Sequence, residues 1–394
     1  MIHRFYLFVK EIISFLFGLS LFASLYLIEP FYRIRIVPCP KRLGEIALRT
    51  YLFLKRQEIY GIDKRTLYVF TSGPPLNRQL LEMFKRKLLI LESTTFWPLK
   101  IFPYWLLKKT RFYIAERCNS NEFLEFNYGS PLLEFTPAEK IKGRRFLMEK
   151  MGINQDKNWF VCLFARDITY LKTYSDVDAS AHDFRNSDID TYIKAVQYII
   201  DKGGYVVRMG SVVNKPMSFK HEKFIDYSIT CRDDFMDIYL PAHCKFFLGN
   251  HSGMTDISTI FHVPRVIVNL AVVGQPPLGK NDIFIPKKVR SIKSRQFINI
   301  KNLLQQTCDQ SVPFLRDGHK FWEMGYEYVD NTEDDIQKAA KEMYERIEGS
   351  FVQSASDKER LQKYYDAIPE NHWAKQVKTP IGRDFLEENS ELYT

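Results

Sequence analysis

The chain has 394 residues, enough for two or three domains of about 150 residues each, which excludes a single small module. Its residues are 45% hydrophobic and 26% charged, a balance that supports packed cores and excludes a wholly disordered chain. Lysine and arginine (56) outnumber aspartate and glutamate (47), and the net charge of +9 favours anionic partners such as phosphates, nucleic acid or anionic lipid.

The first predicted element is an uncharged apolar stretch, residues 12–28, with basic residues on both sides. As a helix it reaches about 26 Å, slightly less than a typical hydrocarbon core. No small-residue cleavage site follows, so we do not expect a removed signal peptide. Three alternatives stay open: a transmembrane anchor, a helix lying in one leaflet, or a buried core helix. More basic residues follow the stretch than precede it, which predicts that the rest of the chain faces the cytoplasm.

Next come two units of strand, loop and helix. Alternating apolar residues predict a strand over 32–37, and helical spacing predicts a helix over 45–58. A second strand is predicted over 66–71, followed by a basic helix over 77–89. The polar segment 119–138 is predicted to be a connection, and we expect a domain boundary near residue 150.

The second half alternates apolar strands with helices. Strands are predicted over 159–165, 205–208, 245–248 and 265–270, and helices over 188–201, 233–243 and 255–262. Strands that are apolar throughout indicate a parallel sheet covered by helices on both faces. Thr332 and Asp335 form a capping signal that predicts a helix to about residue 348, before a polar tail. The four predicted parts are therefore 1–30, 31–150, 151–330 and 331–394.

Three of these strands end in polar or small residues, and the carboxyl ends of parallel strands hold ligands in such sheets. The candidate donor-binding residues are Arg166 after the first strand, Arg208 and Gly210 after the second, and His251, Ser252 and Gly253 after the third. The last three precede a helix, whose free N–H groups suit a diphosphate, and the arginines could add charge-assisted bonds. Each residue also has a plain structural explanation, as a solvated rim arginine or a helix cap.

Further candidates lie in the long loop after Asp167 and on a following helix. Arg185 and Asn186 are candidates for a sugar or phosphate, and Asp237 for a ribose or base. His182 lies in the same loop and could act in catalysis or be an ordinary loop histidine. Asp176 and Asp178 could chelate Mg²⁺ or Mn²⁺, as could Asp188 and Asp190. We nevertheless expect no metal, because the six cysteines form no CxxC pair and acids are common at a helix start.

Several blocks of the sequence resemble a family of bacterial glycosyltransferases encoded in surface-glycan gene clusters. The matching blocks include RLGEIALRTYLFLKR, FARDITYLK, HDFRNSDIDTYIKAVQYIIDKGGYVVRMG and FMDIYLPAHCKFFLGNHSGMTDISTIFHVPRVIVNLA, and together they cover most of residues 30–275. More distantly, the layout is similar to GT-B enzymes such as lipopolysaccharide heptosyltransferases and protein O-fucosyltransferases. The resemblance implies an α/β fold in which two Rossmann-like domains with parallel sheets face each other.

In the heptosyltransferases, a Gly-Asp in the first domain supplies the catalytic base, and an Asp-Thr-Gly precedes the donor-binding helix. Here Gly44-Glu45 and His251-Ser252-Gly253 stand at the corresponding places. The resemblance also implies a donor held by the second domain, C-terminal helices that pack back, and no bound metal or other cofactor. Glu45 is the first candidate for the base, and Asp167 and His182 are the others.

These observations predict a membrane-associated glycosyltransferase on the cytoplasmic side of the membrane. A nucleotide-sugar donor and a glycan or lipid-linked acceptor are the expected substrates, with inversion at the anomeric carbon. One alternative is a metal-dependent transferase that uses Asp176 and Asp178, and another is a non-catalytic protein that binds a nucleotide sugar or glycan. Basic clusters at 85–87, 108–111 and 287–295 carry no nucleic-acid motif, so we expect them to contact anionic lipid rather than nucleic acid.

Overall fold

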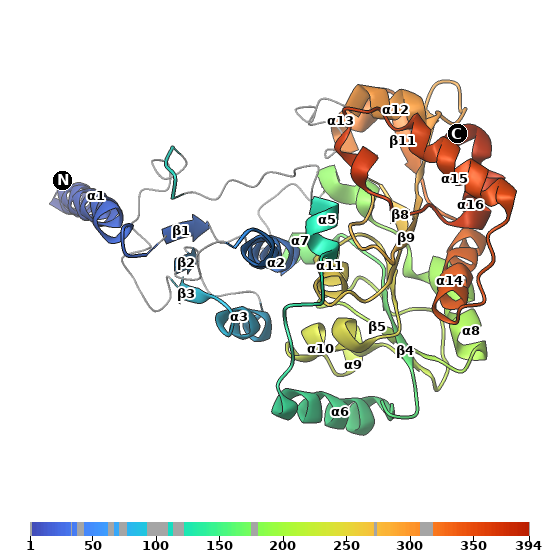
Figure 1. Cartoon of the computed structure of the whole chain (residues 1–394), viewed down its shortest axis with the longest axis horizontal. Coiled ribbons are helices and arrows are strands. Elements are labelled where there is room, and N and C mark those ends of the chain that lie inside the picture. The colour runs from blue at the N-terminus through green and yellow to red at the C-terminus, as the bar shows by residue number, and fades with distance from the viewer. Residues whose placement is uncertain are drawn as a thin grey trace. The chain divides into compact units, whose positions relative to one another are not determined.

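The structure is a computed structural model that describes residues 2–32, 34–37, 43–61, 67–70, 77–92, 109–112, 122–174, 180–271, 274–307 and 318–393. The chain divides into two compact units, shown in Figure 1. The first comprises residues 1–118 and 132–134, and the second comprises 119–131 and 135–394. The boundary therefore lies earlier than the predicted residue 150.

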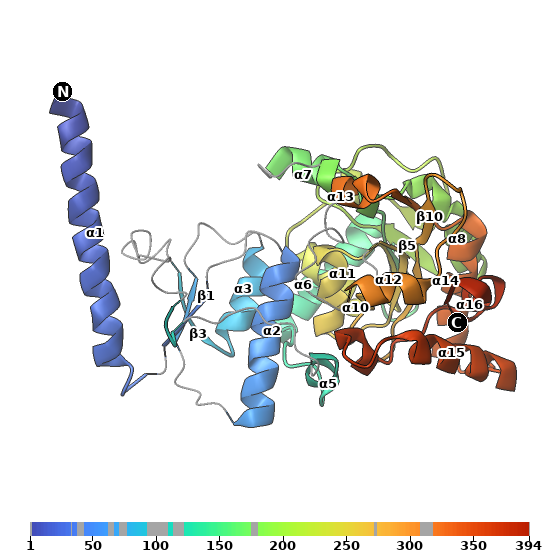
Figure 2. The same cartoon turned by 90° about the horizontal axis from the view of Figure 1, so that it is seen from above.

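The chain begins with one long helix, α1 (Ile2–Ile28), which Figure 2 shows as a single uninterrupted element. Its apolar part, Glu11–Ile28, is long and apolar enough to cross a membrane, and only 18% of it is buried. Length and composition alone are weak evidence for a span, because core helices and signal sequences share them.

The first unit contains a three-stranded parallel sheet in the order β1-β2-β3. Its elements are β1 (Ile34–Val37), α2 (Leu43–Tyr60), β2 (Leu67–Phe70), α3 (Arg78–Lys85) and β3 (Leu89–Glu92). The basic helix predicted over 77–89 is wrong at its end, since it stops at Lys85 and the apolar run after it pairs with β2. Buried Glu92 ends that strand and is held by Arg78 (2.9 Å) and Lys85, partners that a helical pattern does not reveal.

The second unit is built on a six-stranded parallel sheet in the order β6-β5-β4-β7-β8-β9. The strands are β4 (Phe160–Phe164), β5 (Tyr205–Arg208), β6 (Phe224–Ile225), β7 (Phe247–Gly249), β8 (Arg265–Leu270) and β9 (Ile283–Pro286). All six residues of β8 are buried, as expected for a strand covered on both faces. The predicted α/β class with parallel sheets is confirmed.

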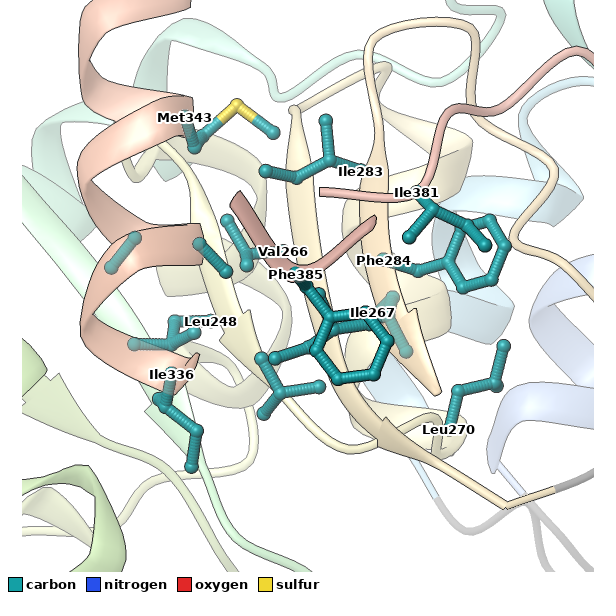
Figure 3. Close-up of a cluster of buried hydrophobic side chains, with 14 of the residues drawn as sticks. Leu248, Val266, Ile267, Leu270, Ile283, Phe284, Ile336, Met343, Ile381 and Phe385 are labelled. Carbon is teal, nitrogen blue, oxygen red and sulfur yellow. The ribbon is translucent and has the colours of Figure 1, made fainter. Parts of the chain in front are cut away.

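Helices cover both faces of this sheet. Figure 1 shows α8 (Ile193–Asp201) and α14 (Glu333–Ile347) on one face, and α10 (Met236–His243) and α11 (Gly253–Ile260) on the other. The core beneath α14 joins Leu248, Val266 and Ile283 of three strands to Ile336 and Met343 of the helix (Figure 3).

The remaining elements of the second unit are short or lie at its ends. They are α5 (Glu122–Asn127), α6 (Pro137–Met151), α7 (Thr169–Tyr174), η2 (Ser180–Arg185), η3 (Ile189–Tyr192), α9 (Tyr227–Thr230), β10 (Lys288–Ser291), α12 (Ile300–Thr307), α13 (Gly318–Glu323), β11 (Tyr326–Val329), α15 (Ala355–Ala367), η5 (Trp373–Gln376), α16 (Arg383–Glu388) and α17 (Ser390–Tyr393). Strands β10 and β11 pair antiparallel in a small separate sheet. Helix α5 falls within the segment predicted to be only a connection.

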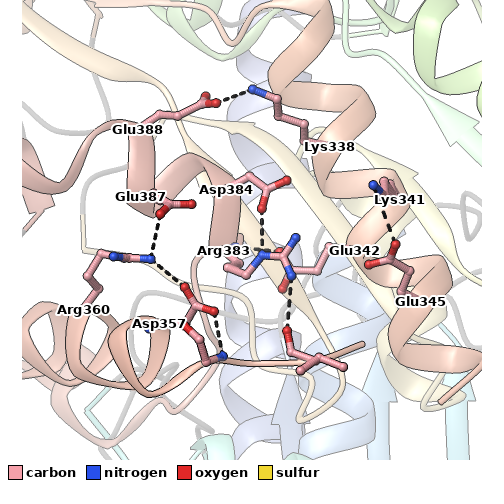
Figure 4. A network of polar contacts seen from close by, with 12 residues as sticks. Lys338, Lys341, Glu342, Glu345, Asp357, Arg360, Arg383, Asp384, Glu387 and Glu388 are labelled. Atoms are coloured by element: carbon pink, nitrogen blue, oxygen red, sulfur yellow. Dashed lines mark hydrogen bonds and ion pairs between the residues drawn. The ribbon is translucent and has the colours of Figure 1, made fainter. Parts of the chain in front are cut away.

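The C-terminal helices are joined by ion pairs (Figure 4). Buried Glu342 accepts hydrogen bonds from the Arg383 backbone N–H (2.6 Å) and Arg346 Nε (2.9 Å), which ties α14 to the start of α16. Arg360 of α15 forms ion pairs with Asp357 in the same helix and with Glu387 of α16. The helix predicted from Thr332 is confirmed, with the expected capping box between Thr332 and Asp335.

Candidate functional site

The carboxyl ends of β4, β5 and β7 lie side by side in the second unit. Leu163 of β4 is in register with both Arg208 of β5 and Leu248 of β7. The residues after these three strands therefore share one edge of the sheet, as predicted. Gly249 allows the close approach of β4 and β7, because a Cβ there would lie 2.1 Å from the carbonyl oxygen of Phe164.

Asn250, directly after β7, connects this edge to the loop that follows β4. Its Oδ1 accepts hydrogen bonds from the Arg166 backbone N–H (3.0 Å), Ser187 Oγ (2.7 Å) and Tyr192 OH (3.0 Å). Its Nδ2 donates to the Arg185 carbonyl at 3.5 Å. Asn250 is 1% exposed, so its amide fixes the geometry here rather than contacting solvent.

Arg166 and Lys287 hold Asn186 from two sides. The Arg166 guanidinium donates to Asn186 Oδ1 (2.7 Å) and to the His182 carbonyl (3.1 Å). Lys287 Nζ, after β9, donates to the Asn186 carbonyl (2.7 Å) and pairs with Asp330 (2.7 Å). Burial lowers the pKa of Lys287, and the Asp330 carboxylate opposes that shift. Two cationic groups thus anchor the loop at the sheet edge.

Arg185 lies beside the start of α11. Its Nη2 donates to the His251 carbonyl at 3.3 Å, so the side chain crosses from the loop to the residue before Ser252. His251 Nε2 lies 3.4 Å from Asp256, which also lies 3.5 Å from Arg265. The structure therefore brings together Arg166, Arg185, Asn186, Asn250, His251, Ser252 and Lys287, which we call the edge cluster.

The start of α11 provides unused backbone donors within the edge cluster. Ser252 is the N-cap, and its side chain and that of Thr255 form a reciprocal capping box. The first N–H groups of a helix have no intrahelical partners, so those of Gly253 and Met254 can bind an anion. With the helix dipole and the nearby arginines, this arrangement suits phosphate oxygens.

Arg208 and Gly210 each have a structural role at the end of β5. The Arg208 guanidinium is 3% exposed and bonds Asp226 at 2.8 Å, so a buried ion pair occupies the group expected to hold phosphate. Gly210 has φ of 154°, and a Cβ there would meet Val213 at 2.7 Å. Its role in this structure is to allow the turn after β5.

Asp237 is buried in the first turn of α10, away from direct contact with the edge cluster. It accepts hydrogen bonds from Tyr227 OH (2.8 Å) and Arg232 Nη2 (2.7 Å). Burial raises the pKa of Asp237 to about 6, while Arg232 and Tyr227 act in the opposite direction. These partners place Asp237 in a local polar network between residues 227 and 237.

The predicted catalytic residues are placed differently from one another. Asp167 follows Arg166, but its carboxylate oxygens accept hydrogen bonds from the backbone N–H groups of Thr169 (2.8 Å) and Asn214 (2.9 Å). These bonds stabilise the loop after β4. His182 adjoins the edge cluster through its carbonyl. Glu45 lies in the first turn of α2 in the other unit, and its side chain lies outside the described part of the chain.

No metal site is evident in the described ranges, which contain no group of three His, Cys, Asp or Glu side chains able to hold an ion. Asp176 and Asp178 lie outside the described residues. Asp188 and Asp190 are described, and both pair with Lys215 at 2.8 and 2.7 Å. Their carboxylates are therefore occupied by a lysine and by the cap of the following helix.

The sequence pattern does not predict the roles of Asn250 and Lys287. Asn250 lies among the small and polar residues directly after β7, and this position could have suggested that it belongs to the site. Lys287 was assigned to a lipid-facing basic cluster, which is wrong for this residue because its side chain is 3% exposed. Arg290 and Arg295 of the same cluster both pair with Glu327, at 2.7 and 2.6 Å.

A scan against protein-family models and a search of curated proteins found no match for this chain. Among solved structures, it is similar to a family 9 glycosyl transferase from Veillonella parvula, with 11% identity, a TM-score of 0.44, and coverage of 79% of this chain and 97% of that one.

Two heptosyltransferase structures are also similar. The ADP-heptose lipopolysaccharide heptosyltransferase II of E. coli has 13% identity and a TM-score of 0.42, covering 64% of this chain and 89% of that one. The iron-containing dodecameric heptosyltransferase TibC, solved with ADP-D-β-D-heptose, has 9% identity and a TM-score of 0.34, covering 64% and 62%. TM-scores below 0.5 at such identities do not establish an activity, so function must be inferred from the site.

Proposed function

We propose that the chain is a glycosyltransferase whose second unit binds the diphosphate of a nucleotide-activated sugar at the edge cluster. The observation that carries this proposal is the convergence of Arg166, Arg185 and the start of α11, all held in place through Asn250. The acceptor is a glycan or lipid-linked molecule, and the chain attaches to the cytoplasmic side of the membrane through residues 12–28.

A diphosphate suits this site because the leaving group gains negative charge as the bond to the sugar breaks. Guanidinium groups and helix N–H groups that are held in place before the donor binds can stabilise that charge with little reorganisation. The Arg185 side chain and the N–H groups of Gly253 and Met254 are the donors nearest the helix start. Such donors can replace a divalent cation, so the proposed reaction is metal-independent.

The acceptor hydroxyl needs a base as it attacks the anomeric carbon. Glu45 is the proposed base, by analogy with the Gly-Asp position of the heptosyltransferases, and attack opposite the diphosphate inverts the anomeric centre. Asp167 is a weaker candidate because both its oxygens already accept backbone N–H groups. His182 remains a candidate in the loop beside Arg166.

A thermal-shift screen tests the donor class, since a ligand that binds only the native state raises Tm with the logarithm of its concentration. The panel contains UDP, GDP, ADP, CMP and CDP with their common sugars, and ADP-heptose is included because TibC was solved with it. We expect one nucleotide class to raise Tm and Arg185→Ala to abolish the shift. Arg144→Ala, at an exposed arginine paired with Asp156, is the matched control.

The same ligand then tests turnover, measured as nucleoside diphosphate released from its sugar in the presence of a glycan and lipid acceptor panel. Release that depends on acceptor supports a transferase. Binding without release supports a non-catalytic binding protein instead. Loss of activity in EDTA that Mn²⁺ restores would support the metal-dependent alternative at Asp176 and Asp178.

A further inference from the structure

The C-terminal end of α1 carries a group of exposed aromatic side chains. Tyr26 is 46% exposed, Phe31 69% and Tyr32 46%. The chain turns immediately after the helix, where the N–H groups of Phe31 and Tyr32 both donate to the Ile28 carbonyl, at 3.0 and 2.9 Å. Aromatic residues at the end of an apolar helix are typical of the boundary between hydrocarbon and lipid headgroups.

A turn from a distant part of the same unit, residues 109–112, packs against this end of α1. Phe112 is fully buried, and its ring makes an edge contact with Tyr26 at a centroid distance of 4.9 Å. The Arg111 guanidinium carbon lies 5.7 Å from the ring centroids of both Tyr26 and Phe112. The turn is therefore fixed to the helix end by aromatic packing.

The charges at this junction leave cationic groups facing outward. Glu29, directly after α1, forms an ion pair with Arg111, which offsets its negative charge. Arg111 is still 64% exposed, and a guanidinium has five N–H donors, so further donors remain for another anion. Lys109, two residues earlier, is also exposed. By contrast, the two arginines of the basic cluster at 287–295, Arg290 and Arg295, both form ion pairs with Glu327.

We infer that the membrane boundary crosses the protein at this junction, with Tyr26, Phe31 and Tyr32 among the headgroups and Arg111 with Lys109 bound to the phosphates of anionic lipids. The occupant is a bilayer surface rather than a protein, because large apolar side chains stay exposed along the preceding helix: Ile12, Ile13, Phe15, Leu16 and Phe17 are each more than 40% exposed. The inference rests on the proposed membrane attachment and is independent of the transferase activity.

Cysteine accessibility tests the inference on the full chain. The chain is reconstituted into vesicles of phosphatidylcholine alone or of phosphatidylcholine with phosphatidylglycerol, and treated with a membrane-impermeant maleimide. Peptide-level mass spectrometry then reads each introduced cysteine separately from the native ones. Leu16→Cys probes the apolar part of α1, Phe31→Cys probes the boundary, and Val352→Cys, 76% exposed in the other unit, is the solvent reference.

We expect Leu16→Cys to stay unlabelled in both vesicles and Val352→Cys to react equally in both. Phe31→Cys should react on the order of fivefold more slowly in the anionic vesicles, the effect of about one cationic contact at the surface. Adding Arg111→Glu should remove that difference, whereas Arg144→Glu, at a similarly exposed arginine of the other unit, should leave it unchanged.

Three results would overturn the inference. Leu16→Cys labelled as fast as Val352→Cys would show that α1 is not in the bilayer. Equal labelling of Phe31→Cys in the two vesicles would exclude the anionic-lipid contact. An equal effect of Arg144→Glu and Arg111→Glu would show a general charge effect. Arg111→Gln removes the charge without reversing it, and an unchanged Tm for either variant excludes misfolding as the cause.

Discussion

Asn250→Ala should destabilise the second unit because one amide oxygen satisfies three donors there. The variant removes the hydrogen bonds from the Arg166 N–H, Ser187 Oγ and Tyr192 OH. At about 1 kcal/mol net for each bond, the loss is about 2–3 kcal/mol. The estimate is not larger because Tyr192 OH keeps a contact with Ser187 Oγ at 3.1 Å.

For a unit of this size, that loss lowers Tm by about 3–5 °C, measured by thermal unfolding followed by circular dichroism. Ser187→Ala removes only one of the three donors and should cost about 1 kcal/mol. Asn302→Ala, at an exposed position on α12, is the matched control and should change stability by less than about 0.5 kcal/mol. A Tm for Asn250→Ala within about 1 °C of that of the control would refute the role given to Asn250.

Three further outcomes follow from buried groups. Gly249→Ala should prevent normal folding, because its Cβ would lie 2.1 Å from the carbonyl oxygen of Phe164; a soluble variant with native circular dichroism would contradict the close β4–β7 packing. Since burial raises the pKa of Asp237 to about 6, its contribution to stability is largest below about pH 4 and is lost as the pH rises through about 6. Because Asn mimics the protonated carboxyl, Asp237→Asn should have a Tm close to that of the wild type near pH 4 and a higher Tm than the wild type at neutral pH, and a Tm difference that does not change with pH would argue against the shift. Glu342→Ala should lower stability by about 2–3 kcal/mol in denaturant unfolding, because it leaves the Arg383 N–H and the Arg346 guanidinium without that carboxylate; a loss no larger than that of an exposed Glu→Ala variant would count against it.

Local sequence patterns were sufficient for much of the second unit. Strands β5 and β8 have the predicted bounds, and β4 and β7 differ by one or two residues at their ends. Their side chains are mostly apolar, with Arg208, Arg265 and Asn269 as the polar exceptions, so the local pattern already indicates burial on both faces of the sheet. Strands β3, β6, β9, β10 and β11 were missed, because short strands depend on partners in other parts of the chain.

The same distinction applies to the site. The position of Arg166 beside His251 and Ser252 follows from parallel strand order, which a sequence pattern can suggest. The roles of Asn250 and Lys287 depend on contacts with residues 43 to 101 positions away in the chain. Arg208 is a different case. An arginine is a suitable residue for binding an anion, but in the structure its guanidinium group already pairs with the Asp226 carboxylate.

The central claim is that the donor phosphates bind at the start of α11 beside Arg185. Isothermal titration with the nucleoside diphosphate that raises Tm tests it most directly. Arg185→Ala and Ser252→Trp should each weaken Kd by about tenfold or more, since a hydrogen bond to a charged group contributes about 1.5–3 kcal/mol. Arg144→Ala should leave Kd unchanged. Wild-type affinity in both Arg185→Ala and Ser252→Trp would contradict the account.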